Sequence, residues 1–513
     1  MKLDFTKDIK RNVTASAINS FLKLFFPFLN RSLFLWLLGP KYLGLNGLFV
    51  SILGVLSLAE LGFGSAIHAS LYKTVADDNN TLMCAYLQFY RKIYRYVGTF
   101  IFIIGLCLMP FLRKLIHGTI PPDLNLYILY LIHLTNTAFS YFFFAYRGCI
   151  LGAHNRKDVL SNINTLVTII QYVSVCLVLL LTRNYYYYVL TTVTFTVLGN
   201  LLIFKESRRL FPNIEPNGKL PDEIRNQVLM KVRSIFLHKI GGVISHQADN
   251  IVISAFLGLI SIAIYGNYYY VVTSVCGLVS SAYASMPGGF GNKIHTESKE
   301  ENFALFMRMS RFTQVLILWC ASMMIALYQP FISFWTKGNP MLLRHSLTPL
   351  LMVLYFYIHQ SRQILLTFKS AALLWDQDKW KPIIAGAVNL SLNFTMIINL
   401  PDEYKLDGVI LSTIVSFALI QIPWETHVVF TCFFNHTQEL QYWKQHASFA
   451  VLAVMQCFLT WSAANMVTME RALQRLIVKG IAAAIVSSLL TLFFFQSDIK
   501  EFLARRKEAS TSA

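Results

Sequence analysis

Apolar segments of membrane-spanning length constrain the fold of this chain more than any other feature. A helix needs about 20 apolar residues to cross the hydrocarbon core of a bilayer. Because lipid offers no hydrogen bonds, every backbone N–H and C=O group must find its partner within the segment, and helices are expected. Such segments lie at 15–39, 44–70, 96–112, 124–146, 160–182, 184–204, 234–257, 258–286, 312–335, 346–368, 382–400, 406–434, 445–468 and 474–496. The sequence therefore predicts an all-α polytopic membrane protein of about fourteen transmembrane helices.

The composition agrees with a chain that is solvated mainly by lipid. Of its 513 residues, 55% are hydrophobic and 14% are charged, whereas about a quarter of a soluble domain is charged. The formal net charge is +18. The basic residues are dispersed between apolar spans and form no continuous stripe, so they indicate cytoplasmic loops and no nucleic acid partner.

The distribution of Lys and Arg predicts the orientation. If the N-terminus is cytoplasmic, the inward loops and termini carry far more basic residues than the outward loops. With an odd number of spans, the Lys-rich and Arg-rich loops would no longer fall mainly on the cytoplasmic side. We therefore expect a multi-pass protein with an even number of spans and both termini in the cytoplasm. No compact apolar core followed by a small-residue cleavage site occurs near the N-terminus, so the first span is expected to be retained.

A polar, basic segment divides the chain into related parts. The expected organisation is an N-terminal six-helix lobe over 1–204, a basic cytoplasmic linker over 205–233, a C-terminal six-helix lobe over 234–434, and two further helices with a basic tail over 435–513. Six is an even number, so the two lobes would share one orientation.

The starts of the two lobes resemble each other. Arg31 precedes the glycine of Leu38-Gly39 by eight residues, and Asn250 precedes the glycine of Leu257-Gly258 by the same interval. The match is short, and chance is the competing explanation.

Motifs for enzymatic chemistry do not occur in the sequence. It contains no phosphate-binding Gly-x-x-x-x-Gly-Lys-Ser/Thr loop, no His-Glu-x-x-His and no Gly-x-Ser-x-Gly. The eight cysteines form no Cys-x-x-Cys pair, which excludes a recognisable zinc or redox motif. We expect a protein that is not an enzyme, with no catalytic residues, no metal and no cofactor.

Polar and charged residues at membrane depth are the candidate site residues. A charge near the bilayer centre costs about 2.5 to 3.5 kcal/mol and usually faces a wet cavity or a partner. The first span carries its polar groups on one helical face, and the seventh span has a similar stripe. These residues are Lys23, Asn30 and Arg31 in the first span, and Lys239, His246, Asp249 and Asn250 in the seventh. The two stripes predict a central cationic cavity between the lobes.

Each of the other ionisable residues has two possible roles. Glu60 in the second span could couple to an ion gradient or pair with a basic neighbour, and the same alternatives apply to Asp249 and His246. Arg362 could contact substrate in the cavity or extend its charged end to the nearby membrane face.

Several segments resemble the Wzx-type polysaccharide flippases. This family belongs to the superfamily of multidrug, oligosaccharidyl-lipid and polysaccharide exporters, which also includes the lipid II flippase. The resemblance rests on Arg31, on 38–49 (LGPKYLGLNGLF), on 56–67 (LSLAELGFGSAI), and in the second half on 249–254 (DNIVIS) with 265–269 (YGNYY). The layout of six, six and two spans fits along the whole chain.

The resemblance implies a V-shaped pair of helical lobes in the bacterial inner membrane. Such a protein moves an undecaprenyl-pyrophosphate-linked oligosaccharide to the outer leaflet, for O-antigen, capsule or another surface polysaccharide. Its expected partners are membrane lipid, a polysaccharide polymerase and a chain-length regulator. A cationic cavity suits pyrophosphate, so Lys23, Arg31 and Lys239 are expected to meet the anionic headgroup together with Asn30, Asn250 and Arg362.

Three other functions compete with this interpretation. A lipid II flippase shares the anionic lipid carrier and the span layout. A cation-coupled multidrug exporter should prefer an acidic, aromatic cavity, which the deep Lys and Arg residues disfavour. A membrane-embedded glycosyltransferase or ligase would usually carry a large outward loop, and the outward loops expected here are short.

Overall fold

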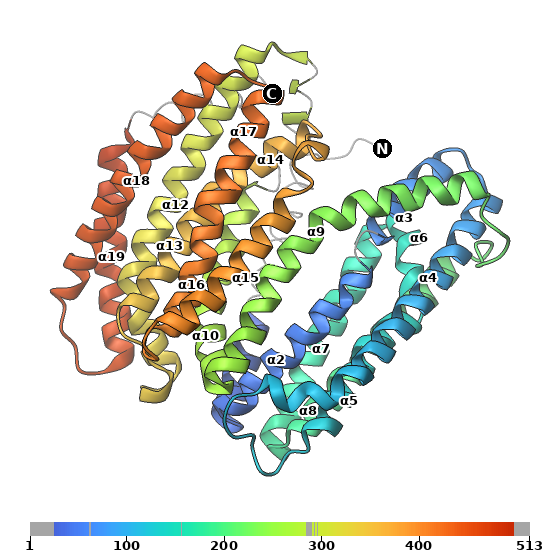
Figure 1. Cartoon of the computed structure of the whole chain (residues 1–513), viewed down its shortest axis with the longest axis horizontal. Helices are drawn as coiled ribbons and strands as arrows, with labels where there is room; N and C mark the ends of the chain where they lie inside the picture. The colour runs from blue at the N-terminus through green and yellow to red at the C-terminus, as the bar shows by residue number, and fades with distance from the viewer. Residues whose placement is uncertain are drawn as a thin grey trace, which may run out of the picture. The chain divides into compact units, whose positions relative to one another are not determined.

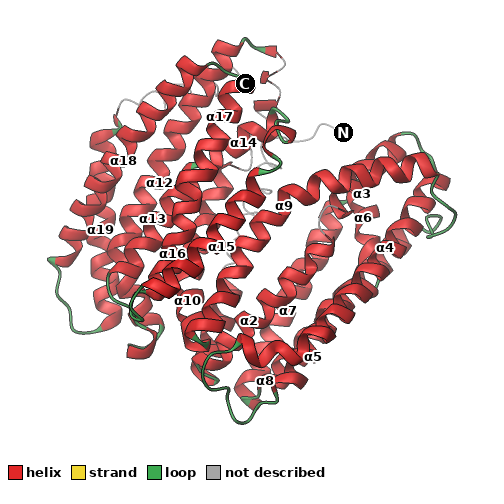
Figure 2. Cartoon of the chain, viewed as in Figure 1, coloured by secondary structure: helices red, strands yellow, loops and turns green. Residues whose placement is uncertain are grey.

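The computed structural model describes residues 25–60, 63–154, 156–283, 290–291, 293–294 and 296–496. Across these residues the regular structure is helical (Figure 2). The chain divides into two compact units, Met1–Ala263 and Ile264–Ala513. The units are drawn in Figure 1 and are described separately below.

The first unit begins with a helix that is described over residues 25–37. The elements that follow are α2 (Pro40–Leu56), η1 (Ser57–Glu60), α3 (Phe63–Ala76), α4 (Asn80–Leu108), η2 (Met109–Leu115), α5 (Leu126–Phe142), η3 (Ala145–Arg147), α6 (Gly148–Ala153), α7 (Lys157–Thr182), α8 (Tyr185–Leu210) and α9 (Asp222–Leu257). Helix α10 (Leu259–Tyr283) starts in this unit and continues into the second.

The second unit contains longer helices and two interrupted ones. Its further elements are α12 (Lys299–Trp335), η4 (Pro340–Leu342), α13 (Leu347–Ser361), α14 (Gln363–Ala371), η5 (Asp376–Asp378), α15 (Lys381–Asn399), α16 (Lys405–Ser416), the π-helix η6 (Phe417–Gln421), α17 (Ile422–Cys432), α18 (His436–Asn465) and α19 (Ala472–Phe494).

The helices have the length and surface of membrane spans. Within the described part of the chain, nine helices are long and apolar enough to cross a bilayer, and α2 is a shorter apolar helix. Large apolar side chains such as Leu181, Val454 and Phe493 are exposed on their outer faces, where lipid and not water is the solvent that suits them. The prediction of an all-α polytopic membrane protein is confirmed. Two segments that were expected as single spans, 44–70 and 346–368, are instead interrupted helices.

The segment expected as a cytoplasmic linker is largely helical. Residues 205–210 belong to α8 and residues 222–233 to α9, which leaves only 211–221 between them. Ile214, Leu220, Val228 and Val232 are buried in an apolar cluster with side chains of α3, α4 and α6. Whether the predicted lobes 1–204 and 234–434 act as mechanical units stays a prediction.

A buried arginine holds the 211–221 segment against the first unit. The Arg147 guanidinium donates to the backbone oxygen of Ile214 at 3.1 Å and forms an ion pair with Glu215 at 2.6 Å. It also lies over the Phe204 ring, 5.3 Å from the ring centre. Because a buried charge is costly without a partner, these contacts fix the segment to the helices.

Side-chain amides and hydroxyls attach the last two helices to α12. Gln456 of α18 donates to Ser487 and Thr491 of α19 at 3.2 and 3.0 Å, and to Ser322 of α12 at 3.3 Å. Hydrogen bonds of this kind join helices in membranes, where apolar contact alone provides little driving force.

Two glycines beside helix ends share an unusual backbone conformation. Gly39, before α2, has φ 100° and ψ 175°, and Gly258, after α9, has φ 84° and ψ 178°. Only glycine adopts this region readily because it lacks a Cβ atom. The two Leu-Gly pairs that suggested a repeat therefore occupy equivalent local structures.

We expect both Gly39→Ala and Gly258→Ala to destabilise the protein, and Gly258→Ala to do so more. Each introduces backbone strain of about 1–3 kcal/mol. At Gly39 an added Cβ would meet no atom within 4 Å, whereas at Gly258 it would lie 2.7 Å from the His117 carbonyl oxygen. Thermal unfolding of the purified variants in detergent measures the order. An unchanged unfolding temperature for Gly258→Ala would contradict this account.

Candidate functional site

The polar groups of the first helix contact α8. Asn30 Nδ2 donates to the Tyr188 hydroxyl at 3.2 Å, and Arg31 lies close enough to Tyr188 to interact with it electrostatically. Asn30 Oδ1 is buried and has no hydrogen-bond partner among the described residues. Lys23, the third predicted residue of this stripe, lies outside the described residues.

The polar stripe of the seventh span lies on α9. Asn250 Nδ2 donates to Ser51 Oγ of α2 at 2.9 Å, and Asp249 beside it is buried. Lys239 and His246 belong to the same helix, but their side chains are outside the described set. The meeting of Lys239 with Arg31 in one cavity therefore stays a prediction.

Glu60 lies at a helix interruption and is surrounded by tyrosines. It ends the 3₁₀ segment η1, between α2 and α3. The Tyr94 hydroxyl donates to Glu60 Oε1 at 3.1 Å, and the Tyr90 hydroxyl donates to Tyr94 at 2.7 Å. This chain of hydroxyls ends on a carboxylate, an arrangement that can hold a proton or a small cation.

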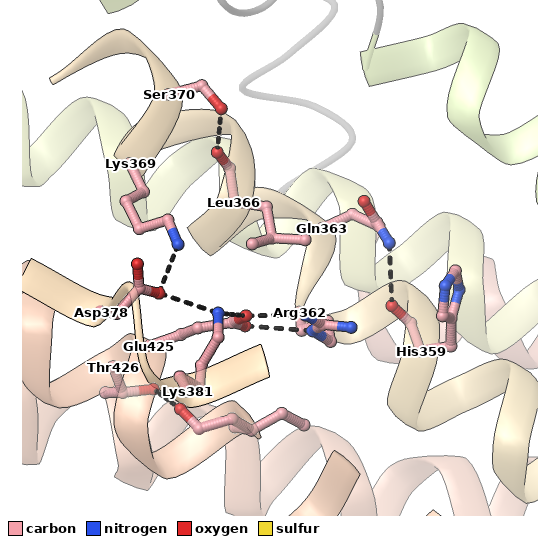
Figure 3. Close-up of polar contacts among 11 residues, drawn as sticks. His359, Arg362, Gln363, Leu366, Lys369, Ser370, Asp378, Lys381, Glu425 and Thr426 are labelled. Carbon is pink, nitrogen blue, oxygen red and sulfur yellow. Dashed lines mark hydrogen bonds and ion pairs between the residues drawn. The ribbon is translucent and has the colours of Figure 1, made fainter. Parts of the chain in front are cut away.

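The most developed polar site of the described structure is in the second unit and centres on Arg362. Its guanidinium forms a fork with Glu425 of α17: Nε donates to Oε2 at 3.0 Å and Nη2 to Oε1 at 2.7 Å (Figure 3). The Glu425 side chain is fully buried and that of Arg362 is 11% exposed. Two parallel charge-assisted bonds of this kind are among the strongest polar contacts in proteins.

Three further charged side chains extend this pair into a row. Lys381 Nζ contacts Glu425 and also lies 2.8 Å from Asp378 Oδ2. Lys369 Nζ, from α14, lies 2.5 Å from the same Asp378 oxygen. We call these five residues the charged cluster, and Figure 3 shows them as an alternating row of cations and anions from Lys369 to Arg362.

An aromatic ring covers the cation at each end of the row. Lys369 Nζ is 4.3 Å from the centre of the Trp375 ring, and the Arg362 guanidinium is 5.0 Å from the centre of the Phe417 ring. Ring faces attract cations and compensate partly for lost water. The two ends of the charged cluster are therefore stabilised without further carboxylates.

The charged cluster carries a surplus positive charge. It contains three basic and two acidic side chains. Lys369 and Lys381 balance Asp378 and Glu425, so that the remaining charge is that of Arg362. Arg362 also has the most exposed side chain of the five. The site can therefore attract an anion at its Arg362 end.

Irregular backbone surrounds Arg362. The residue itself separates α13 from α14, and Phe417, which contacts it, begins the π-helix η6. Single-turn π-helices and interrupted membrane helices occur frequently at functional sites because the backbone can adjust there. Among the described residues, no group of His, Cys, Asp and Glu side chains has the arrangement of a metal site.

Of the charged cluster, only Arg362 was predicted from the sequence. Glu425 was missed although it is an acid within a predicted span, which is a recognisable signal. Lys369, Asp378 and Lys381 fall at or beyond the ends of predicted spans and look there like ordinary loop charges. Their burial follows from the packing of α14, η5 and α15.

We expect Asp378→Asn to destabilise the protein more than Arg362→Gln. Removing the Asp378 charge leaves three buried cations with one carboxylate, at a cost of about 3–5 kcal/mol. Removing Arg362 leaves a neutral set of four and should cost about 2 kcal/mol less. Thermal unfolding in detergent measures both, and Asp158→Asn, at an exposed ion pair, serves as a control with little expected effect. Equal losses at the two buried positions would contradict the charge balance.

Comparisons with known proteins identify the fold. No family model and no curated protein matches the chain. Among solved structures, the lipid II flippase MurJ in an inward closed conformation is similar, with a TM-score of 0.67 and 14% sequence identity over 94% of this chain and 99% of that one. An inward-facing MATE multidrug resistance transporter has a TM-score of 0.57 and 12% identity over 79% of this chain and 94% of that one. A transporter of the same superfamily from Pyrococcus furiosus, described as having a binding pocket of reversed polarity, has a TM-score of 0.50 and 11% identity over 80% of this chain and 93% of that one. This multi-pass membrane chain therefore has a fold like that of MurJ and of the MATE transporter.

Proposed function

We propose that the protein is a flippase that moves undecaprenyl-pyrophosphate-linked oligosaccharides across the bacterial inner membrane for the synthesis of a surface polysaccharide. The observation that carries the proposal is the surplus positive charge of the charged cluster, at a place where the backbone is irregular. A pyrophosphate head is an anion that matches the fork of an arginine.

An apolar groove in the second unit supports a lipid-linked substrate. It has a volume of about 460 Å³ and is partly open to its surroundings. Helices α12, α13 and α18 line it, with Ile325, Leu350, Leu354, Val454, Phe458 and Trp461 among the lining side chains. The lining is almost wholly apolar, which suits part of a polyprenyl chain.

The remaining candidate residues receive roles in this scheme. Arg31, Lys23 and Lys239 would contact the anionic head together with Arg362, while Asn30 and Asn250 would bind polar groups near it. Glu60 or Asp249 would couple transport to an ion gradient. Alternating access would expose the site first to one side of the membrane and then to the other. Such transport makes and breaks no covalent bond, and the product would pass to a polymerase and a chain-length regulator.

Lipid II translocation is the alternative that a specific observation favours. The similarity to MurJ extends over nearly the whole of both chains, and lipid II carries the same kind of anionic polyprenyl head. The two functions differ in the sugar part of the substrate and are separated by substrate tests. A cation-coupled drug exporter fits less well, because a site with surplus positive charge repels cationic drugs.

Loss of the gene should leave lipid-linked oligosaccharide on the cytoplasmic side of the membrane. We expect the wild-type gene to restore export, and Arg31→Ala, Lys239→Ala and Arg362→Ala copies to reduce it by at least tenfold because they remove charges that meet the head. Labelling of one leaflet in intact membranes, followed by lipid extraction, measures how the lipid-linked oligosaccharide is distributed between the two leaflets. Arg156→Ala, at an exposed ion pair, is the control. Normal surface glycan in the deletion strain, without a second flippase, would refute the proposal.

Filling the apolar groove should slow transport without unfolding the protein. Val454→Trp places a large ring at the groove, and we expect several-fold less export because the polyprenyl chain is excluded. Val451→Trp is the matched control: Val451 and Val454 are both exposed on α18, by 67% and 73%, and only Val454 lines the groove. Export assays with protein levels measured in parallel test this. Equal effects of the two substitutions would argue against a role for the groove.

A further inference from the structure

We infer that Glu425 is an internal ligand of Arg362, which an anionic group of the substrate replaces during binding. The inference rests on the proposed function for the nature of the substrate, a lipid-linked phosphate or pyrophosphate. It adds a mechanism in which the carboxylate leaves Arg362 and stays with Lys381, which it already contacts.

The fork between Arg362 and Glu425 is the geometry that a phosphate group would adopt. Both bonds run from guanidinium nitrogens to the two oxygens of one planar anion, at 3.0 and 2.7 Å. Phosphate oxygens accept from the same pair of nitrogens in arginine–phosphate recognition. A phosphate can therefore replace the carboxylate while the guanidinium keeps its two charge-assisted hydrogen bonds.

Glu425 has a second cation that can hold it after the exchange. Lys381 Nζ already contacts Glu425 Oε1, the oxygen that Arg362 Nη2 also approaches. A buried carboxylate that lost its only partner would be strongly disfavoured. Glu425 keeps a partner, because Lys381 still contacts it after Arg362 has released it. The four residues left behind, Lys369, Asp378, Lys381 and Glu425, have no net charge.

The surroundings of Arg362 allow the exchange. Arg362 has an 11% exposed side chain, whereas the other four side chains of the charged cluster are at most 5% exposed. In Figure 3 it lies at the end of the row, beside His359 and Gln363 of the neighbouring helical turns. The Phe417 ring, 5.0 Å from the guanidinium, holds that group in place when the carboxylate departs.

The test is whether removal of the Glu425 charge tightens the binding of pyrophosphate, a change that a purely structural ion pair would not produce. With purified full-length protein in detergent and inorganic pyrophosphate as the probe, calorimetry should show at least tenfold tighter binding for Glu425→Gln than for the wild type. Glutamine has the same shape but no charge, so it competes poorly for Arg362. The double variant Glu425→Gln/Arg362→Gln should lose this gain, which assigns it to Arg362 and not to surface lysines.

Two further variants test the transfer and its location. Lys381→Met should weaken pyrophosphate binding below the wild-type level, because Glu425 then depends on Arg362 alone. The matched control is Glu215→Gln, which removes the carboxylate paired with Arg147 in the first unit and should leave the affinity unchanged. If Glu425→Gln does not fold, Glu425→Asp keeps the charge but shortens the side chain, and a smaller gain in the same direction is expected.

Equal or weaker pyrophosphate binding by a folded Glu425 variant would overturn the inference. So would a gain that survives in the Arg362→Gln double variant. The proposed function fails by a different result, normal export in the deletion strain. A gain that requires Arg362 would support the internal ligand even in that case, because binding is measured without the lipid-linked substrate.

Discussion

An ion buried in a lipid-embedded helix bundle must have a partner of opposite charge, and this requirement organises the polar parts of both units. Removal from water costs several kcal/mol per ion, which only close and well-directed contacts recover. In the first unit, Arg147 meets the cost through Glu215 and a backbone oxygen, and thereby fixes the segment between α8 and α9. In the second unit, the charged cluster joins α14, η5, α15 and α17 in the same way.

The two sites differ in the exposure of their carboxylates. Arg147 is paired by a carboxylate that also meets Arg208, and the pair closes a surface segment. The carboxylates of the charged cluster are fully buried, whereas the Glu215 side chain is 45% exposed. Four members of the charged cluster form a neutral set, and Arg362 adds a fifth charge to it. Arg362 is therefore the member to which the proposed function assigns the contact with substrate.

Interrupted helices accompany several of the polar residues that the structure describes. Glu60 ends a 3₁₀ segment, Arg362 separates two helices, and Phe417 begins a π-helix. Regular helices satisfy all their backbone groups and resist deformation, whereas these interruptions allow small local shifts. The inferred release of Glu425 by Arg362 would use such a shift. It would connect the binding of an anionic head to the packing of α13, α14 and α17.

The sequence by itself determined the class of fold, because the length and apolar character of the spans leave helices as the only solution in lipid. It also matched the Leu-Gly words that contain Gly39 and Gly258. It named Arg362 as a candidate site residue, with extension to the membrane face as the alternative. It did not predict that α9 begins at Asp222, or that α13 ends at Ser361. Only the tertiary structure decided that Arg362 pairs with Glu425, 63 residues away, and that Lys369, Asp378 and Lys381 are buried. The physical reason is that a charge at the end of a span looks the same in sequence whether water or another helix covers it, and only packing determines which of the two is present.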